Sequence, residues 1–181
     1  MTTMEYLQTP ETVLPRELAF GVLRVADSPV VRHQRVVRDL TIALTAFTRE
    51  ARLGEVLPAP MDVILDYDAN LIVQPDLLFV ADERSEIVRD RVYGAPDLVI
   101  EVLSPHPRIG RLDERVEWFA RYGVRECWLV DVGRRQMAVL ECSDGRLSQR
   151  RLVGPDEAVP TGVLTGFRAT PVSLFGWAWG S

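Results

Sequence analysis

The feature that most constrains this chain is a single glutamate inside an otherwise apolar strand. Residues 98–103 read LVIEVL, and apolar side chains on both faces are typical of a central strand covered by two layers. Glu101 interrupts this run. An isolated carboxylate is costly to bury, so Glu101 should be paired with a cation, protonated or bound to metal. Taken alone, a structural ion pair with an arginine and a functional site explain Glu101 equally well.

Two aspartates stand at the start of apolar stretches. Asp76 follows Pro75 and precedes Leu77, and Asp97 follows Pro96 at the start of the central strand. Aspartate after proline is often only a turn residue. Because side chains alternate along a strand, Asp97 and Glu101 would point to the same face of a regular strand. Carboxylates that converge at one sheet edge would form a hard-oxygen site suited to Mg²⁺ or Mn²⁺.

The order of the other predicted elements indicates an α/β protein. A strand at 18–25 leads to a long helix, which Ser28 and Pro29 open and Gly54 closes. A second helix is expected from Leu112 to Tyr122, and a short one after Pro171. Further strands are expected at 56–65, 71–80, 98–103, 125–132 and 136–142, the last two as a hairpin. This order predicts a mixed central β-sheet flanked by helices.

Length, charge and cysteines limit the class of protein. The 181 residues fit one domain, and no uncharged run approaches the roughly 18 residues that cross a bilayer, so no membrane contact is expected. The net charge of −5 argues against binding nucleic acid through bulk electrostatics, although local arginines could still meet phosphates. Cys127 and Cys142 lie in apolar stretches and no secretory signal opens the chain, which favours free thiols in the cytoplasm.

Several stretches in a fixed order carry a family resemblance. They read ELAFGVL (17–23), GEVLPAPMDVIL (54–65), QPDLLFV (74–80), APDLVIEVLSP (95–105), WFARYGV (118–124) and RECWLVDV (125–132). The set resembles a large group of bacterial restriction-endonuclease-like proteins, abundant in cyanobacteria and actinobacteria, within the PD-(D/E)XK nuclease superfamily. The resemblance covers a core of about 16–174 in a single domain spanning 1–181. It implies a restriction-endonuclease-like fold and a metal-dependent endonuclease that hydrolyses DNA phosphodiester bonds.

The resemblance also assigns roles to individual positions. Asp76 matches the superfamily's PD aspartate and Glu101 its acidic partner, and the backbone carbonyl of Val102 would be a further ligand to Mg²⁺ or Mn²⁺. In the family this metal polarises the scissile phosphate and activates a water. His33 has the helical spacing of a core histidine, yet the family often carries histidine there, so it stays a candidate. His106 reads as a loop residue after the metal strand.

One position departs from the superfamily pattern. Leu103 stands where the pattern has lysine, and in this bacterial group the lysine comes from the following helix, where this chain has Arg115. Residues 112, 115, 119 and 122 share a helical face, which predicts that Arg115 points toward the sheet. Arginine can hold a phosphate but cannot act as a base near neutral pH. A catalytically weak or inactive module that binds nucleic acid or a partner, and a hydrolase of another phosphate ester, therefore stay open.

The uncharged tail leaves the oligomeric state open. Trp177 and Trp179 either cap the core or join a homodimer. The homodimer is the expectation because many nucleases of this fold pair to cut two strands.

Overall fold

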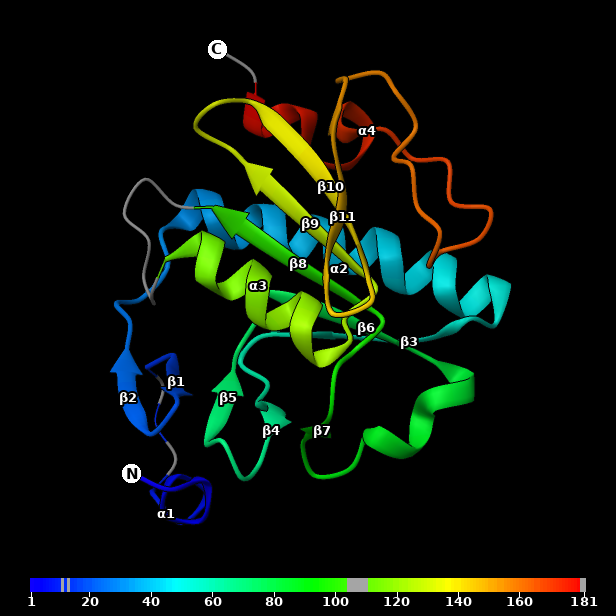
Figure 1. The fold of residues 1–181 in the computed structure, drawn as a ribbon. Helices are drawn as coiled ribbons and strands as arrows, with labels where there is room; N and C mark the ends of the chain where they lie inside the picture. The colour runs from blue at the N-terminus through cyan, green and yellow to red at the C-terminus, as the bar shows by residue number, and fades with distance from the viewer. Residues whose placement is uncertain (11, 13, 104–110, 180–181) are drawn as a thin grey trace.

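The computed structural model describes residues 1–10, 12, 14–103 and 111–179. Helices α2 and α3 lie on opposite sides of a six-stranded sheet, and a smaller sheet stands beside its lower edge (Figure 1). The expected mixed sheet flanked by helices is therefore confirmed, and a second mixed sheet is added to it.

The larger sheet carries the predicted central strand in its interior. Its strand order is β11-β10-β9-β8-β6-β3, and β8 pairs with β9 in parallel while the other neighbours are antiparallel. The strands are β3 (Gly54–Pro58), β6 (Leu77–Ala81), β8 (Leu98–Leu103), β9 (Glu126–Asp131), β10 (Gln136–Ser143) and β11 (Arg146–Val153). The predicted hairpin is confirmed as β9 and β10.

The smaller sheet arises from segments that look continuous in the sequence. It has the order β2-β1-β5-β4-β7, built from β1 (Arg16–Ala19), β2 (Val22–Val25), β4 (Val63–Asp66), β5 (Leu71–Val73) and β7 (Val92–Tyr93). The strand expected at 18–25 is wrong, because a turn at Phe20 and Gly21, both with positive φ, folds it into a hairpin. The strands expected at 56–65 and 71–80 are also each divided between the two sheets.

Alternating side chains of the central strand face different helices. Ile100 and Val102 of β8 pack in the core beneath α2 (Val31–Ala51), and Val99 packs in the core beneath α3 (Leu112–Tyr122). The predicted boundaries of α3 are confirmed, including Gly123 as its left-handed C-cap. Glu101 lies on the α3 side of the strand, where the first turns of that helix cover it.

The predicted ends of α2 are wrong. The helix begins at Val31 after Val30, which offers no side-chain cap, and it closes on Arg52 in the left-handed conformation. Gly54 instead opens β3 at a φ of +147°, where an added Cβ would lie 2.1 Å from the carbonyl oxygen of Val80. Glycine is therefore needed there for a close strand contact rather than for helix capping.

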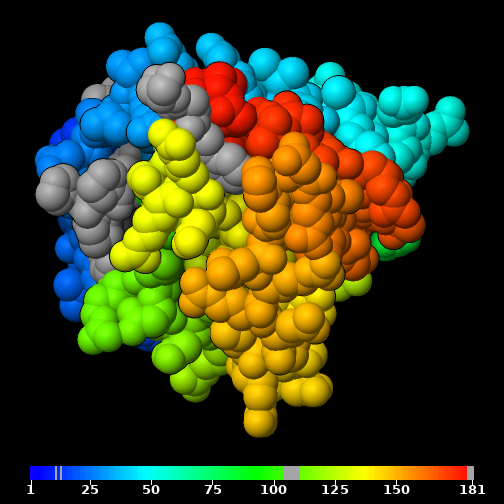
Figure 2. Space-filling model, turned by 90° about the horizontal axis from the view of Figure 1, so that it is seen from above, coloured from blue at the N-terminus to red at the C-terminus, as the bar shows by residue number. Residues whose placement is uncertain are grey.

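Short helices complete the chain: α1 (Thr3–Leu7), η1 (Asp82–Ile87), α4 (Pro171–Phe175) and η2 (Gly176–Trp179). The C-terminal segment, red in Figure 2, lies directly against the blue and cyan α2. The indole N–H of Trp177 donates to Asp39 of α2 over 2.5 Å, although 45% of Trp177 is exposed. Among the described residues, no helix has both the length and the apolarity to cross a membrane.

Candidate active site

Asp76 and Glu101 meet where the chain passes from the smaller sheet to the larger one. Asp76 lies in the bend between β5 and β6, and β6 pairs with β8 through Leu77 opposite Ile100. Continuing this antiparallel register by one residue sets Asp76 opposite Glu101. Residues opposite one another in such a pair have Cβ atoms about 4.5–5.5 Å apart, within reach of a shared cation.

Two partners fix the carboxylate of Asp76. Its Oδ2 accepts the backbone N–H of Val102 over 2.7 Å, and its Oδ1 lies 3.1 Å from Nε2 of His33 on α2. His33 is 5% exposed, and its Nδ1 has no hydrogen-bond partner among the described residues. His33 is thus a buried helix residue, as its spacing predicted, and it also contacts the candidate site.

Arg115 joins Glu101 to a second buried glutamate. The guanidinium donates from Nη2 to Glu101 over 2.6 Å and from Nη1 to Glu17 of β1. Arg115 is only 6% exposed, so the prediction that it faces the sheet is confirmed. Glu17 is 1% exposed and also accepts the backbone N–H of Gln74, two residues before Asp76, over 2.7 Å.

Glu17 is the site residue that the sequence reasoning missed. It lies in one of the stretches that carry the family resemblance, at the start of the apolar run ELAFGVL. A carboxylate next to an apolar strand was the signal that singled out Glu101, and the same signal applies to Glu17. Its partner lies 98 residues away in sequence, so no local pattern predicts the pair.

Charge and burial compete at Glu101. Burial raises the pKa of Glu101 to about 7, helped by the negative charge of Asp76 and opposed by the charge and hydrogen bond of Arg115. Burial alone would lower the pKa of Arg115, but the charges of Glu101 and Glu17 outweigh it and raise that pKa. Arg115 therefore remains a cation, while Glu101 changes its charge near neutral pH.

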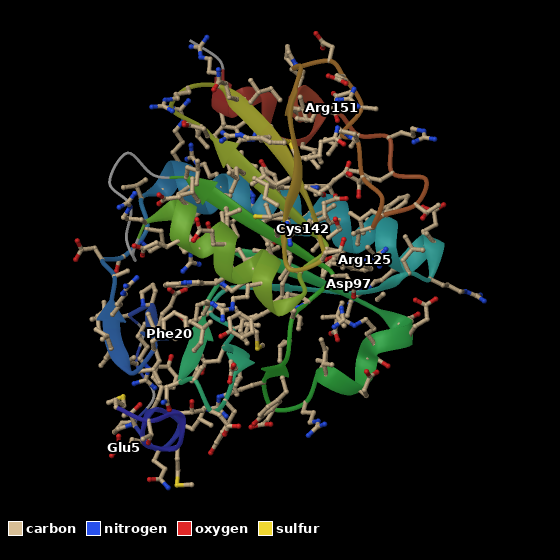
Figure 3. All side chains as sticks on the ribbon, viewed as in Figure 1. Glu5, Phe20, Asp97, Arg125, Cys142 and Arg151 are labelled. Atoms are coloured by element: carbon tan, nitrogen blue, oxygen red, sulfur yellow. The ribbon has the colours of Figure 1, made fainter. Side chains whose placement is uncertain are left out.

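The structure does not bring Asp97 into this cluster. Asp97 is fully buried before β8, where it accepts the N–H of Ala81 and pairs with Arg84 at 3.1 Å and with Arg125 at 3.3 Å. Figure 3 shows Asp97 and Arg125 next to each other, on the other side of the molecule from Phe20 of the β1–β2 hairpin. Through this hydrogen bond and these ion pairs, Asp97 holds the neighbouring segments against the larger sheet. His106 lies outside the described residues.

The donor set fits a hard divalent cation. Arg115 pairs with Glu17 and Glu101, and the negative charge of Asp76 acts on Glu101, so the three carboxylates have one guanidinium among them and negative charge is in excess. Glu101 and Asp76 keep 12% and 16% of their side chains exposed. In the described part of the chain, no three or more His, Cys, Asp or Glu side chains form a ready metal site. Two carboxylates completed by waters and phosphate oxygens are nevertheless a common environment for Mg²⁺.

The mixed sheet between two helices, with paired carboxylates at its end, defines a nuclease-like α/β fold. The chain belongs to the Uma2 family, whose model carries the description "Putative restriction endonuclease" and matches residues 4–173. A solved structure from Anabaena variabilis, described as a "putative nuclease belonging to DUF820", aligns with a TM-score of 0.83 at 18% identity. The alignment covers 98% of this chain and 99% of that one, so the two proteins share a fold. No curated protein matches the chain.

Proposed function

We propose that the protein is an endonuclease that hydrolyses DNA phosphodiester bonds with the help of Mg²⁺ or Mn²⁺. The observation that carries this proposal is the meeting of Asp76 and Glu101 at the end of the larger sheet, with the pKa of Glu101 raised by burial and by Asp76. A carboxylate whose pKa is shifted by burial together with a specific charged neighbour is a candidate for a functional site. The family description and the fold of the Anabaena protein support the same function.

Each residue of the cluster has a role in this proposal. Asp76, Glu101 and the backbone carbonyl of Val102 would hold the cation, which supplies charge neutralisation at the scissile phosphate and acidifies water. The Val102 N–H and His33 keep the carboxylate of Asp76 oriented. Arg115 holds the carboxylate of Glu101, and it cannot take a proton from water because it stays charged.

The proposal has a direct test with two readouts. Supercoiled plasmid with Mg²⁺ or Mn²⁺ should be nicked by the wild-type protein and left intact by the Glu101→Gln variant. Calorimetric titration with Mn²⁺ should show binding that Asp76→Ala removes. If Mn²⁺ binds equally well to Asp76→Ala, the carboxylates do not form the metal site and the enzymatic function fails.

A second candidate is a nuclease-fold module that binds nucleic acid or a partner without catalysis. It is favoured by Arg115, which replaces the family's lysine and whose Nη1 and Nη2 both donate to carboxylates. Arg115→Lys separates the two candidates. A weak enzyme should nick faster once lysine is restored, whereas a binding module should stay inactive.

The proposal extends to the assembly and the location of the protein. A single domain over 1–181 that acts in the cytoplasm as a homodimer would let two sites address the two strands of a duplex. Light scattering at several protein concentrations tests the dimer, because a monomer mass throughout would exclude it.

A further inference from the structure

We infer that the β1–β2 hairpin and α3 form a binding site for an unpaired nucleic-acid strand, with Arg24 taking a phosphate and Phe20 stacking on a base. This inference rests on the proposed function and names the substrate class that the same site would receive. It comes from three side chains outside the carboxylate cluster: Phe20, Arg24 and Trp118.

The three side chains form one group. Trp118 meets the Phe20 ring edge to face, with centroids 5.6 Å apart at an interplanar angle of 84°. The guanidinium of Arg24 lies over the Trp118 ring, 5.5 Å from its centroid. Trp118 thus stands between a cation and a second aromatic ring, and it packs partly buried against the core beneath α3. It holds both neighbours in place.

Two elements, the β1–β2 hairpin and α3, connect this group of side chains to the candidate active site. Arg24 is the direct cross-strand partner of Glu17, so both side chains leave the hairpin on the same face. Trp118 follows Arg115 by three residues on α3, and such residues are neighbours on a helix surface. Glu17 and Arg115 are joined to each other in the cluster. A strand lying across Phe20 and Arg24 would therefore approach Glu101.

The guanidinium of Arg24 makes no hydrogen bond from Nη1 within the described part of the chain. Its Nη1 lies 3.9 Å from Glu114 and is buried without a hydrogen-bond partner among the described residues. Overall 31% of its side chain is exposed. A guanidinium carries five N–H donors, and a buried donor without an acceptor is costly. Arg115 differs, because carboxylates take its Nη1 and Nη2. A phosphate that contacts the exposed part of the Arg24 side chain would give the guanidinium a charge-assisted partner, which Glu114 at 3.9 Å does not supply.

Phe20 supplies the surface for a base. The residue sits at the tip of the hairpin with a positive φ of 49°, and 49% of it is exposed. A phenylalanine is an unusual choice in such a turn, where glycine, asparagine and aspartate are preferred. Aromatic side chains beside a cation are the common means of holding single strands, because every base has a π face. Bases within a duplex are stacked on one another and do not offer it.

A second copy of this chain would fit the same surface less well. Strand β2 is an edge strand with Val22 and Val25 exposed, and it could add to another sheet. Arg24 stands within that strand, and charged residues on an edge strand oppose pairing with another sheet.

The test measures binding without cleavage. The Glu101→Gln protein in EDTA is titrated into a fluorescein-labelled oligothymidylate about 12 nucleotides long, and into a blunt duplex of equal length, at several salt concentrations. In this background Phe20→Leu should weaken oligothymidylate binding about 5-fold or more. Arg24→Gln should weaken it and reduce the salt slope by about 0.7. Arg134→Gln, which removes an exposed charge in the β9–β10 turn, is the matched control.

The outcomes separate this inference from the proposed function. Weaker binding by both variants, with the control unchanged and the duplex bound less tightly, supports the site even if the wild-type protein nicks no plasmid. Unchanged binding in both variants, or no binding by the parent, overturns the site even if plasmid is nicked. A change of scattering mass in Arg24→Gln with unchanged oligothymidylate affinity also overturns it and assigns β2 to a homodimer.

Discussion

Glu101→Gln should stabilise the metal-free protein, and the gain should grow with pH. Glutamine has nearly the shape of a protonated glutamate, and it can still accept the hydrogen bond from Arg115. It removes only the ability to ionise. Below the pKa of an unfolded glutamate the two proteins should therefore unfold with the same free energy.

The magnitude follows from the shift in the pKa of Glu101, from 4.5 to about 7. In the folded state Glu101 binds a proton more tightly than in the unfolded chain, so the free energy of unfolding falls as pH rises between these values. At 1.36 kcal/mol per unit, the loss above pH 7 amounts to about 3 kcal/mol. The Glu101→Gln variant avoids this loss. In a chain of this length the difference corresponds to a melting temperature about 6–12 °C higher at pH 8.

Thermal melts followed by circular dichroism in EDTA at pH 5, 6, 7 and 8 measure this difference. Glu50→Gln, which removes an exposed carboxylate at the end of α2, is the matched control and should track the wild type. A gap between Glu101→Gln and the wild type that is flat with pH would refute the reasoning. So would a less stable Glu101→Gln protein at pH 8, because the ionised glutamate would then be a net favourable partner of Arg115.

Three further substitutions, one of them with a control, test the Arg115 ion pairs, the contact of His33 with Asp76 and the β3–β6 packing. Arg115→Ala should lower the free energy of unfolding in urea by about 3–5 kcal/mol, because two buried glutamates lose their counter-charge; a loss below about 1 kcal/mol would contradict a buried ion pair. His33→Gln should weaken Mn²⁺ binding about 10-fold in calorimetry, since it disturbs the partner that orients Asp76; an unchanged affinity would make His33 a core residue only. Gly54→Ala should cost about 1–3 kcal/mol, because its Cβ would meet a β6 carbonyl at 2.1 Å. Gly133→Ala, with its nearest contact at 3.5 Å, should cost less than Gly54→Ala in the same urea titration.

Local signals predicted the parts of the fold that depend on one element at a time. The apolar run around Glu101 identified the central strand, and the stripe of α3 placed Arg115 against the sheet. Both signals are periodicities of side-chain burial, which a single helix or strand carries in its own sequence. The β9–β10 hairpin was likewise predicted from two apolar runs and a polar turn.

The second sheet could not be predicted in this way. The bend from Gln74 to Asp76 and the break near Pro60 interrupt the apolar runs over only a few residues, so each run reads as one strand. Whether such a run continues or changes sheets depends on pairing partners far away in sequence. Strand β5 pairs with β1, and β6 with β8. The same long-range pairing brings Glu17 to Arg115. The periodicity of a single segment does not predict such a contact.

The bend at Asp76 has a consequence for the chemistry of the site. Because β5 leaves for the smaller sheet, the side chain of Asp76 takes the N–H of Val102, while the backbone carbonyl of Asp76 accepts the N–H of Ala59 over 2.9 Å. Gln74 in the same bend donates its N–H to Glu17, which ties β1 to the site. The bend from Gln74 to Asp76 therefore positions two of the three carboxylates, Asp76 and Glu17. Arg115 links the third, Glu101, to Glu17. A divalent cation at Asp76 and Glu101 would add positive charge beside the guanidinium. If Glu101 bound the cation, Arg115 would still be paired with Glu17. It would therefore not become an unpaired buried charge.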